Sequence, residues 1–250
     1  MEFIKTVKGI VLAIIFITLA IMSPLIAKLT PEILKLASDD ATQEVMDVLA
    51  AMIPDPTAQS SYEQFFGNFN QIGLLALIIV FAGIVANEKS KNTAAYILTK
   101  NISRAQFILS KFAASVVFTF VSVIITMGVQ MLYTNMLFDD YNTIPAKNIL
   151  LFSALLLLYL VFILSIVIFS SVVTKTVTSA TFVAFLIFIT FNLATIIPKI
   201  GKYMPPEVNN FGVLIQTKSI GDLAVNIIVT ALCSVIFIIA SLELFNRQEL

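Results

Sequence analysis

The sequence lacks histidine altogether and has a single cysteine, Cys233. Without histidine, neither histidine-based acid–base catalysis nor histidine ligation of a metal is available. One cysteine cannot form a disulfide framework or a thiolate metal site within the chain. Because Cys233 stands in an apolar run, we expect it to pack as a small hydrophobe. We therefore predict no metal site and no histidine- or thiolate-based catalytic centre.

A phosphate-binding glycine loop is also missing. The chain has 8 glycines, and none of its Lys-Ser or Lys-Thr pairs follows a glycine. The GxxxxGK[ST] motif needs its glycines because their backbone amides cradle the phosphates. We therefore expect that this chain does not hydrolyse ATP by that route, and we predict no cofactor bound to the chain itself.

Charged residues are scarce. Only 12% of the chain is charged, 59% is hydrophobic and the mean hydropathy is +0.99. Soluble domains have about 25% charged residues and about 45–50% apolar residues. The composition therefore predicts an integral membrane protein surrounded by the lipid bilayer. The formal net charge of +0 gives no general attraction to nucleic acid.

Several apolar stretches are long enough to cross a bilayer, whose hydrocarbon core of ~30 Å needs about 20 apolar residues in a helix. The predicted spans are Gly9–Ala27, the part of Phe65–Asn87 from Ile72 onward, Phe112–Phe138, two spans within Asn148–Pro198, and Leu223–Leu242. A single helix over Asn148–Pro198 would be ~75 Å long, so we expect a turn near Thr174–Thr176. The prediction is an all-α fold of six spans, forming one membrane domain over residues 1–250.

Lysine and arginine are distributed unevenly among the segments that join these spans. With the N-terminus inside, the inner segments carry nine Lys and Arg and four acids, and the outer segments carry six and eleven. Cytoplasmic segments are enriched in Lys and Arg. We therefore predict that both termini are cytoplasmic and that the chain is a multi-pass protein of the cell membrane.

Two longer segments lie on the predicted outer side. Residues 28–64 are acidic and read as two short helices followed by an aromatic stretch, SSYEQFFGNFNQ, that suits the membrane interface. This region is either a solvated cap over the outer mouth or a gate or docking surface. Residues 198–221 contain helix-breaking prolines and glycines, and they form either a re-entrant or interfacial element or a plain surface loop.

Polar residues inside the spans are amides and hydroxyls, and no Asp, Glu, Lys or Arg lies near the middle of any span. Intramembrane charges usually mark ion paths, proton relays or voltage sensors, so an ion channel or a proton-coupled antiporter is disfavoured. The amides either join helices through hydrogen bonds or line a weakly polar pathway for apolar or amphipathic cargo. The candidate lining residues are Asn70, Gln71, Gln130 and Asn192.

The segment 87–111 is a basic loop between the second and third spans. Five Lys and Arg and one acid, Glu88, fall within it. Ala94, Ile97 and Leu98 follow the i, i+3, i+4 spacing of one helical face. An apolar face with a basic rim suits docking into a groove of a soluble partner; the alternative is an ordinary positive-inside loop. Glu88 and Arg104 are expected to pair across the hairpin.

This loop resembles the cytoplasmic loop between the second and third spans of ABC-2-type permeases. The matching residues are Glu88, Thr93, Ile97, Leu98, Ser103, Arg104 and Lys111. Asn92 and Asn101 stand where that family usually has Gly and Pro, and asparagine also tolerates turn geometry. The ending LELFNRQEL resembles the family's usual C-terminus as well.

The resemblance implies a membrane subunit of an ATP-driven transporter in a bacterium, and we expect an exporter of peptide, lipid or hydrophobic small-molecule cargo. In such a transporter a short coupling helix in the loop, with Ala94 on its face, contacts a separate ATPase subunit that binds the ATP. A second permease chain, identical or paralogous, completes the pathway. A membrane enzyme is disfavoured because the residues for its chemistry are missing. A regulator or scaffold that binds a soluble or extracytoplasmic partner without transport remains the alternative.

Overall fold

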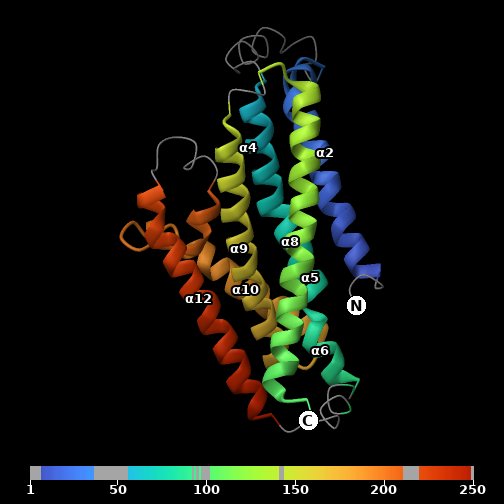
Figure 1. Ribbon diagram of the computed structural model, residues 1–250, viewed down its shortest axis with the longest axis vertical. Coiled ribbons are helices and arrows are strands. Elements are labelled where there is room, and N and C mark those ends of the chain that lie inside the picture. The colour runs from blue at the N-terminus through green and yellow to red at the C-terminus, as the bar shows by residue number, and fades with distance from the viewer. Residues whose placement is uncertain are drawn as a thin grey trace.

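The protein is a bundle of long helices that run close to one common axis (Figure 1). The computed structural model describes residues 7–36, 56–91, 93, 96, 102–140, 144–210 and 220–248. All regular structure in these ranges is helical. The elements are α2 (Val7–Leu36), α4 (Ala58–Asn68), η1 (Phe69–Gly73), α5 (Leu74–Phe81), α6 (Gly83–Ser90), α8 (Arg104–Leu137), α9 (Ala146–Val173), α10 (Val177–Ala194), η3 (Gly201–Tyr203), η4 (Pro205–Asn209) and α12 (Ile220–Asn246).

Six of the described helical segments are long and apolar enough to cross a membrane, which confirms the number predicted from the sequence. The predicted turn inside Asn148–Pro198 is also confirmed, since α9 ends at Val173 and α10 begins at Val177. Thr176 starts α10 as its N-cap, and its side chain accepts a hydrogen bond from the Ser179 amide.

Hydroxyl side chains cap the starts of α4, α8 and α10. Thr57 caps α4 and Ser103 caps α8, each in a reciprocal capping box with the residue three positions on. The Asp140 carboxylate adds a second acceptor for α4 by receiving the Ala58 amide at 3.0 Å. A carboxylate is favourable at this position because the amino end of a helix carries partial positive charge.

Both ends of the predicted outer segment 28–64 are helical, and the second span starts earlier than the predicted Ile72. Helix α2 continues through Lys28 to Leu36, and α4 begins at Ala58. The aromatic stretch assigned to the interface is helical instead, and Phe65, Phe66 and Phe69 are buried in the core. Phe16 of α2 packs against Phe69 with ring centroids 4.6 Å apart. Burial of large apolar rings between two helices stabilises helix here; the expected second short helix, near 39–54, lies outside the described residues.

Helix α9 forms the centre of the bundle. It contacts α5, α6, α8, α10, α12 and η4. Its side chains from Phe162 to Ile168 are all buried. A helix that is apolar on every side must be covered on every side, which explains why the other helices gather around this one.

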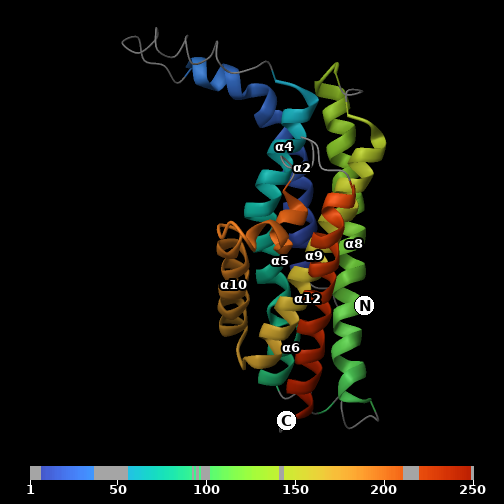
Figure 2. The same cartoon turned by 90° about the vertical axis from the view of Figure 1, so that its left-hand side faces the viewer.

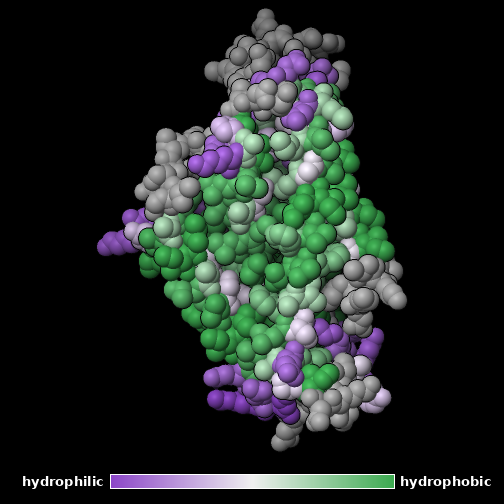
Figure 3. All heavy atoms as spheres, viewed as in Figure 1, coloured by the Kyte–Doolittle hydropathy of each residue, from purple (hydrophilic) through white to green (hydrophobic). Residues whose placement is uncertain are grey.

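An apolar belt surrounds the bundle. Figure 3 shows hydrophobic residues over the middle of the molecule and hydrophilic ones toward both ends of its long axis. Large exposed side chains contribute to the belt from several helices, among them Val117, Ile124, Phe182, Leu186 and Ile236. Apolar surface on this scale is costly in water and is matched to lipid. The fold is therefore that of a membrane protein.

The segment after α10 packs against the bundle. Helix α10 ends at Ala194, and the short helices η3 and η4 follow it in the chain. Figure 2 shows them beside the middle of the bundle. Val208 of η4 is buried with Leu155 and Leu223, and the Asn226 amide donates to the Lys202 carbonyl at 2.7 Å. The described part of the predicted 198–221 segment is therefore an ordered, packed element and not a plain surface loop.

Candidate functional site

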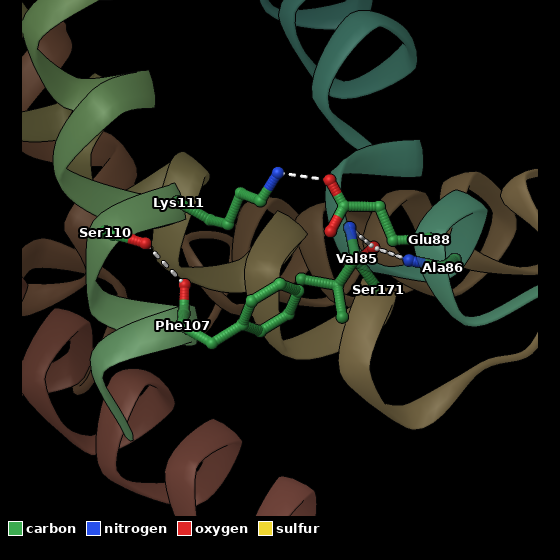
Figure 4. A network of polar contacts seen from close by, with 7 residues as sticks. All are labelled: Val85, Ala86, Glu88, Phe107, Ser110, Lys111 and Ser171. Atoms are coloured by element: carbon green, nitrogen blue, oxygen red, sulfur yellow. Dashed lines mark hydrogen bonds and ion pairs between the residues drawn. The ribbon is translucent and has the colours of Figure 1, made fainter. Parts of the chain in front are cut away.

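The first candidate site is the base of the loop between α6 and α8. We call it the loop-base cluster and define it as Glu88, Lys89, Arg104, Lys111 and Gln248. Glu88 at the end of α6 forms an ion pair with Lys111 of α8 (Figure 4). Both side chains are largely buried, with relative exposures of 14% and 15%. Because the pair is removed from water, it is screened less by salt than a surface pair and joins the two arms of the loop.

Arg104 does not pair with Glu88, so that expectation is wrong. Its guanidinium instead donates to three backbone carbonyls at the end of α12, those of Phe245, Asn246 and Gln248, at 3.0, 2.9 and 2.6 Å. The last carbonyls of a helix have no intrahelical partner, and the carboxyl end carries partial negative charge. Arg104 supplies both the hydrogen bonds and the positive charge, so it fastens the start of α8 to the end of α12.

Aromatic packing reinforces the same junction. Phe107 of α8 stacks on Phe245 of α12, with centroids 5.5 Å apart and planes 12° from parallel. The Lys111 ammonium lies 5.7 Å from the Phe107 ring centroid, within the range of a cation–π contact. The two helices are therefore joined by polar and apolar contacts within two turns of the loop.

Lys89 extends the cluster to α9. Its ammonium donates to the Val172 carbonyl at the end of α9 and, at 3.3 Å, to the Gln248 side chain. The Gln248 amide also donates to the Val172 carbonyl, at 2.9 Å. These contacts satisfy carbonyls that the end of α9 leaves open. They place the ends of α6, α9 and α12 around one point.

A helix break above the cluster is held by Ser171. The helix of the second span is interrupted at Ala82, so α6 starts afresh at Gly83. The amides of Val85 and Ala86 both donate to the Ser171 hydroxyl, at 3.0 and 2.9 Å (Figure 4). In an apolar setting an unsatisfied amide costs several kcal/mol. The serine therefore makes the break tolerable and locks α6 to α9.

The remaining loop residues divide into two groups. Ser103 is the N-cap of α8, where its side chain accepts from the Gln106 amide. Thr93 is exposed, as is Tyr96, which has a relative exposure of 64%. Ala94, Ile97 and Leu98, the predicted docking face, lie outside the described residues.

The second candidate site is a cavity of about 440 Å³, which we call the lateral cavity. Three helical segments and η4 enclose it. From α4, η1 and α5 come Glu63, Phe66, Gly67, Asn70 and Leu74, from α9 Tyr159, from α10 Phe188 and Asn192, from the C-cap of α10 Thr195, and from the η4 region Pro206, Glu207, Asn209 and Asn210. The α4–α5 residues recur at helical spacing and so share one face. The volume lies within the usual range for ligand pockets, about 300–1,000 Å³.

Amide side chains hold the walls of the lateral cavity together. The Asn209 amide donates to the Asn70 side-chain oxygen, and the Asn70 amide donates to the Asn209 carbonyl at 3.4 Å. The Asn192 amide donates to the Phe188 carbonyl at 2.9 Å within α10. Asn70 belongs to η1, a single π-helical turn inside an otherwise α-helical segment. Such turns are often found at functional sites because they redirect side chains.

Only two of the predicted pathway residues come together. Asn70 and Asn192 both line the lateral cavity, whereas Gln71 is exposed and is not part of its lining. Gln130 is buried between α4 and α8, where its amide donates to the Ser61 hydroxyl at 3.1 Å. The Ser61 and Thr134 hydroxyls are hydrogen-bonded at 2.9 Å. Gln130 therefore joins helices and does not line the cavity.

Several residues of both sites were missed by sequence reasoning. Lys89 was counted only as part of a basic rim, and Gln248 only as part of a tail motif. Tyr159 and Glu207 carried no local signal, because the cavity that they line is formed by elements distant in the sequence. The run Asn209-Asn210 after two prolines could have drawn attention, since side-chain amides satisfy backbone groups in irregular segments.

Comparison with known proteins gives one match. The model of a family described as protein of unknown function (DUF2705) matches residues 33–250. No curated protein and no solved structure matches the chain. The matched range includes both candidate sites.

Proposed function

The chain belongs to the DUF2705 family, and from its six membrane-spanning helices and the resemblance of its 87–111 loop we propose that it is the membrane subunit of an ATP-driven transporter of the ABC-2 permease type. A separate ATPase subunit binds and hydrolyses the ATP. It docks on the loop between α6 and α8, on the cytoplasmic side of a bacterial cell membrane. The direction of transport is export, and a second permease chain, a copy or a paralogue, completes the pathway.

The observation that carries this proposal is the convergence of four helix ends on the base of one loop. The loop-base cluster joins α6 to α8 through Glu88 and Lys111, and α8 to α12 through Arg104. Lys89 adds the end of α9. An ordinary connecting loop needs no such bracing, and hydrogen-bonded clusters of this kind make helices move together.

A docked ATPase could act on the membrane through this bracing. Two described residues of the loop, Thr93 and Tyr96, are exposed. When two ATPase subunits close around ATP, a displacement of the loop would tilt α6 and α8 as a unit. Because α9 lies at the centre of the bundle, the same tilt would change the packing of the helices that surround it. Rigid-body motions of packed helices are a common route between two transport states.

The inner wall of the lateral cavity suits an uncharged part of a cargo molecule. The polar groups facing the lateral cavity from η1 and α10 are the side chains of Asn70 and Asn192. Amides hydrogen-bond cargo without the large desolvation cost of an ion. Peptides, lipids and hydrophobic small molecules are compatible with such a lining.

The test is association with an ABC ATPase subunit, sought first among the proteins encoded beside this chain. The two proteins are co-expressed, purified through a tag on the permease, and assayed for ATP hydrolysis with and without the permease. Tyr96→Ala and Leu98→Ser change the loop, whereas Tyr203→Ala changes an exposed tyrosine of η3 and serves as the matched control.

We expect the unaltered chain and Tyr203→Ala to retain the ATPase and to change its rate. The loop variants should lose both properties while folding normally by circular dichroism. If the loop variants bind and stimulate the ATPase as well as the control does, the loop is not the docking site. If no ATPase is retained by the unaltered chain, a regulator or scaffold without transport becomes the better description.

A further inference from the structure

We infer that the lateral cavity binds a small organic cation, with an ammonium group held near Glu63 and Glu207 and an apolar or aromatic part between the rings of the cavity wall. That such a ligand is also the transported cargo rests on the proposed function. The binding itself does not, because every group in the argument belongs to this chain.

The charge of the cavity wall favours a cation. Glu63 and Glu207 are among the described residues that line it, and no Lys or Arg is. Across the described ranges, the ion pairs are Glu88–Lys111 and Glu243–Arg247, so neither cavity carboxylate is neutralised in this way. Glu63 accepts a hydrogen bond from the neutral Gln59 amide at 2.9 Å, which leaves its charge in place.

The nearest lysines of the η3 region do not reverse this balance. Lys202 places its ammonium 4.8 Å from the Tyr203 ring centroid, and Lys199 is exposed in the turn after α10. Neither lines the lateral cavity. Two carboxylates in the lining of a partly apolar cavity concentrate field lines there and attract positive charge.

Aromatic rings supply the second element of cation recognition. Phe66, Tyr159 and Phe188 come from α4, α9 and α10, and so reach the cavity from three sides. The face of an aromatic ring attracts an ammonium group that lies within about 6 Å of its centroid. The same rings offer apolar surface to an uncharged part of the ligand.

The arrangement also separates the two parts of the ligand. Glu63 lies two helical turns before Asn70, about 10 Å along the helix axis. Glu63 and Gly67 are exposed, which leaves this edge of the cavity open, whereas Tyr159 and Leu74 are buried. A charged group is therefore expected near the open edge and an apolar group deeper inside, beside Asn70 and Asn192.

The experiment compares two small probes that share a benzyl group and differ in charge, benzyltrimethylammonium and phenylmethanesulfonate. Binding of each radiolabelled probe to the purified full-length chain in non-ionic detergent is measured by equilibrium dialysis. The variants are Glu63→Gln, Glu207→Gln and the double variant. Glu32→Gln, an exposed acid of α2 outside the cavity, is the matched control.

We expect saturable binding of the cation and at least tenfold weaker binding of the anion. Each cavity variant should weaken cation binding by about threefold and the double variant by about tenfold, as for partly exposed charge pairs. The control should bind as the unaltered chain does. Equal binding of the two probes, or full cation affinity in the double variant, would overturn the inference.

A further variant, Phe188→Leu, tests the site without changing its charge. It is needed because the glutamate variants could weaken binding by disturbing the fold. It keeps an apolar side chain but removes a ring, and it should weaken the cation while leaving the helical content unchanged. This assay contains no ATPase. A chain that binds the cation but retains no ATPase would therefore support cation binding and reject the proposed function. A chain that retains the ATPase but does not bind the cation would support the proposed function and reject cation binding.

Discussion

Breaking the ion pair between Glu88 and Lys111 from one side should destabilise the protein far more than removing both partners. Lys111→Met leaves the Glu88 carboxylate 14% exposed and without its cation. The second carboxylate oxygen of Glu88 is already buried with no hydrogen-bond partner among the described residues. An uncompensated buried charge costs about 3–5 kcal/mol. Because the Glu88 side chain keeps some contact with solvent, we expect the free energy of unfolding to fall by an amount at the lower end of this range, about 3 kcal/mol.

The double variant Glu88→Leu/Lys111→Met removes both charges and replaces them with apolar groups. A buried ion pair exchanged for apolar side chains is often neutral or slightly stabilising. We therefore expect the double variant to lie within about 1 kcal/mol of the unaltered chain. Taken with the single variants, this gives a coupling free energy of at least ~2 kcal/mol, which is typical of residues in direct contact.

The free energy of unfolding is measured by titrating purified protein from mild detergent into SDS and following helical content by circular dichroism. Arg247→Met is the matched control, because Arg247 and Glu243 form an exposed pair at 3.8 Å with relative exposures of 81% and 68%. An exposed pair contributes little, so the control should lose less than ~0.5 kcal/mol. The reasoning fails if Lys111→Met costs no more than Arg247→Met, or if the single effects simply add in the double variant.

Three further outcomes follow from particular contacts. Arg104→Ala removes three hydrogen bonds to the end of α12, so amide exchange over the last turn of α12 should quicken by about tenfold; Arg104→Lys should restore only part of the protection. Gly201→Ala would place a Cβ 2.0 Å from the Thr195 carbonyl oxygen, so it should lower the free energy of unfolding by more than ~2 kcal/mol and abolish cation binding. Gly128→Ala is its control: a Cβ there meets open space, so the free energy of unfolding should be unchanged or rise by up to ~1 kcal/mol. Gln130→Leu should shift the free energy of unfolding by less than ~1.5 kcal/mol and leave cation binding unchanged, because this side chain only joins α4 to α8; loss of binding would return Gln130 to the pathway.

Much of the fold could be predicted from the sequence because the bilayer imposes a strict length on apolar helices. The turn between α9 and α10 follows from this constraint, since one helix over Asn148–Pro198 would be far too long. The start of the second span could not be predicted in the same way. Residues 58–71 are rich in Ser, Gln and Asn, so hydropathy places them outside the membrane, yet Phe65 and Phe69 draw the segment into the core.

The candidate site was predictable only where the partners are close in the sequence. Ser103 could be recognised as a cap because Gln106 stands three residues on. The partner of Arg104 could not be recognised, because the carbonyls that it contacts lie more than 140 residues away. Glu88, the one acid in the loop, was an equally reasonable choice. The amides Asn70 and Asn192 were identified by their type alone, and the Asn209 contact arises from packing of η4 that no local pattern indicates.

The central claim is that an ATPase subunit docks on the loop whose base is braced by the loop-base cluster, and site-specific cross-linking tests it most directly. The single native cysteine allows a clean background, Cys233→Ala, into which one cysteine is placed at Tyr96 in the loop or at Asn210 beside the lateral cavity. Membranes containing the chain and the ATPase that co-purifies with it are treated with a photoactivatable maleimide, which reacts with the cysteine thiol and, on illumination, with a neighbouring protein. We predict a permease–ATPase adduct from position 96 and none from position 210. An adduct from position 210 would contradict the account. So would labelling of position 96, to the same extent as position 210, by an impermeant maleimide added outside intact cells.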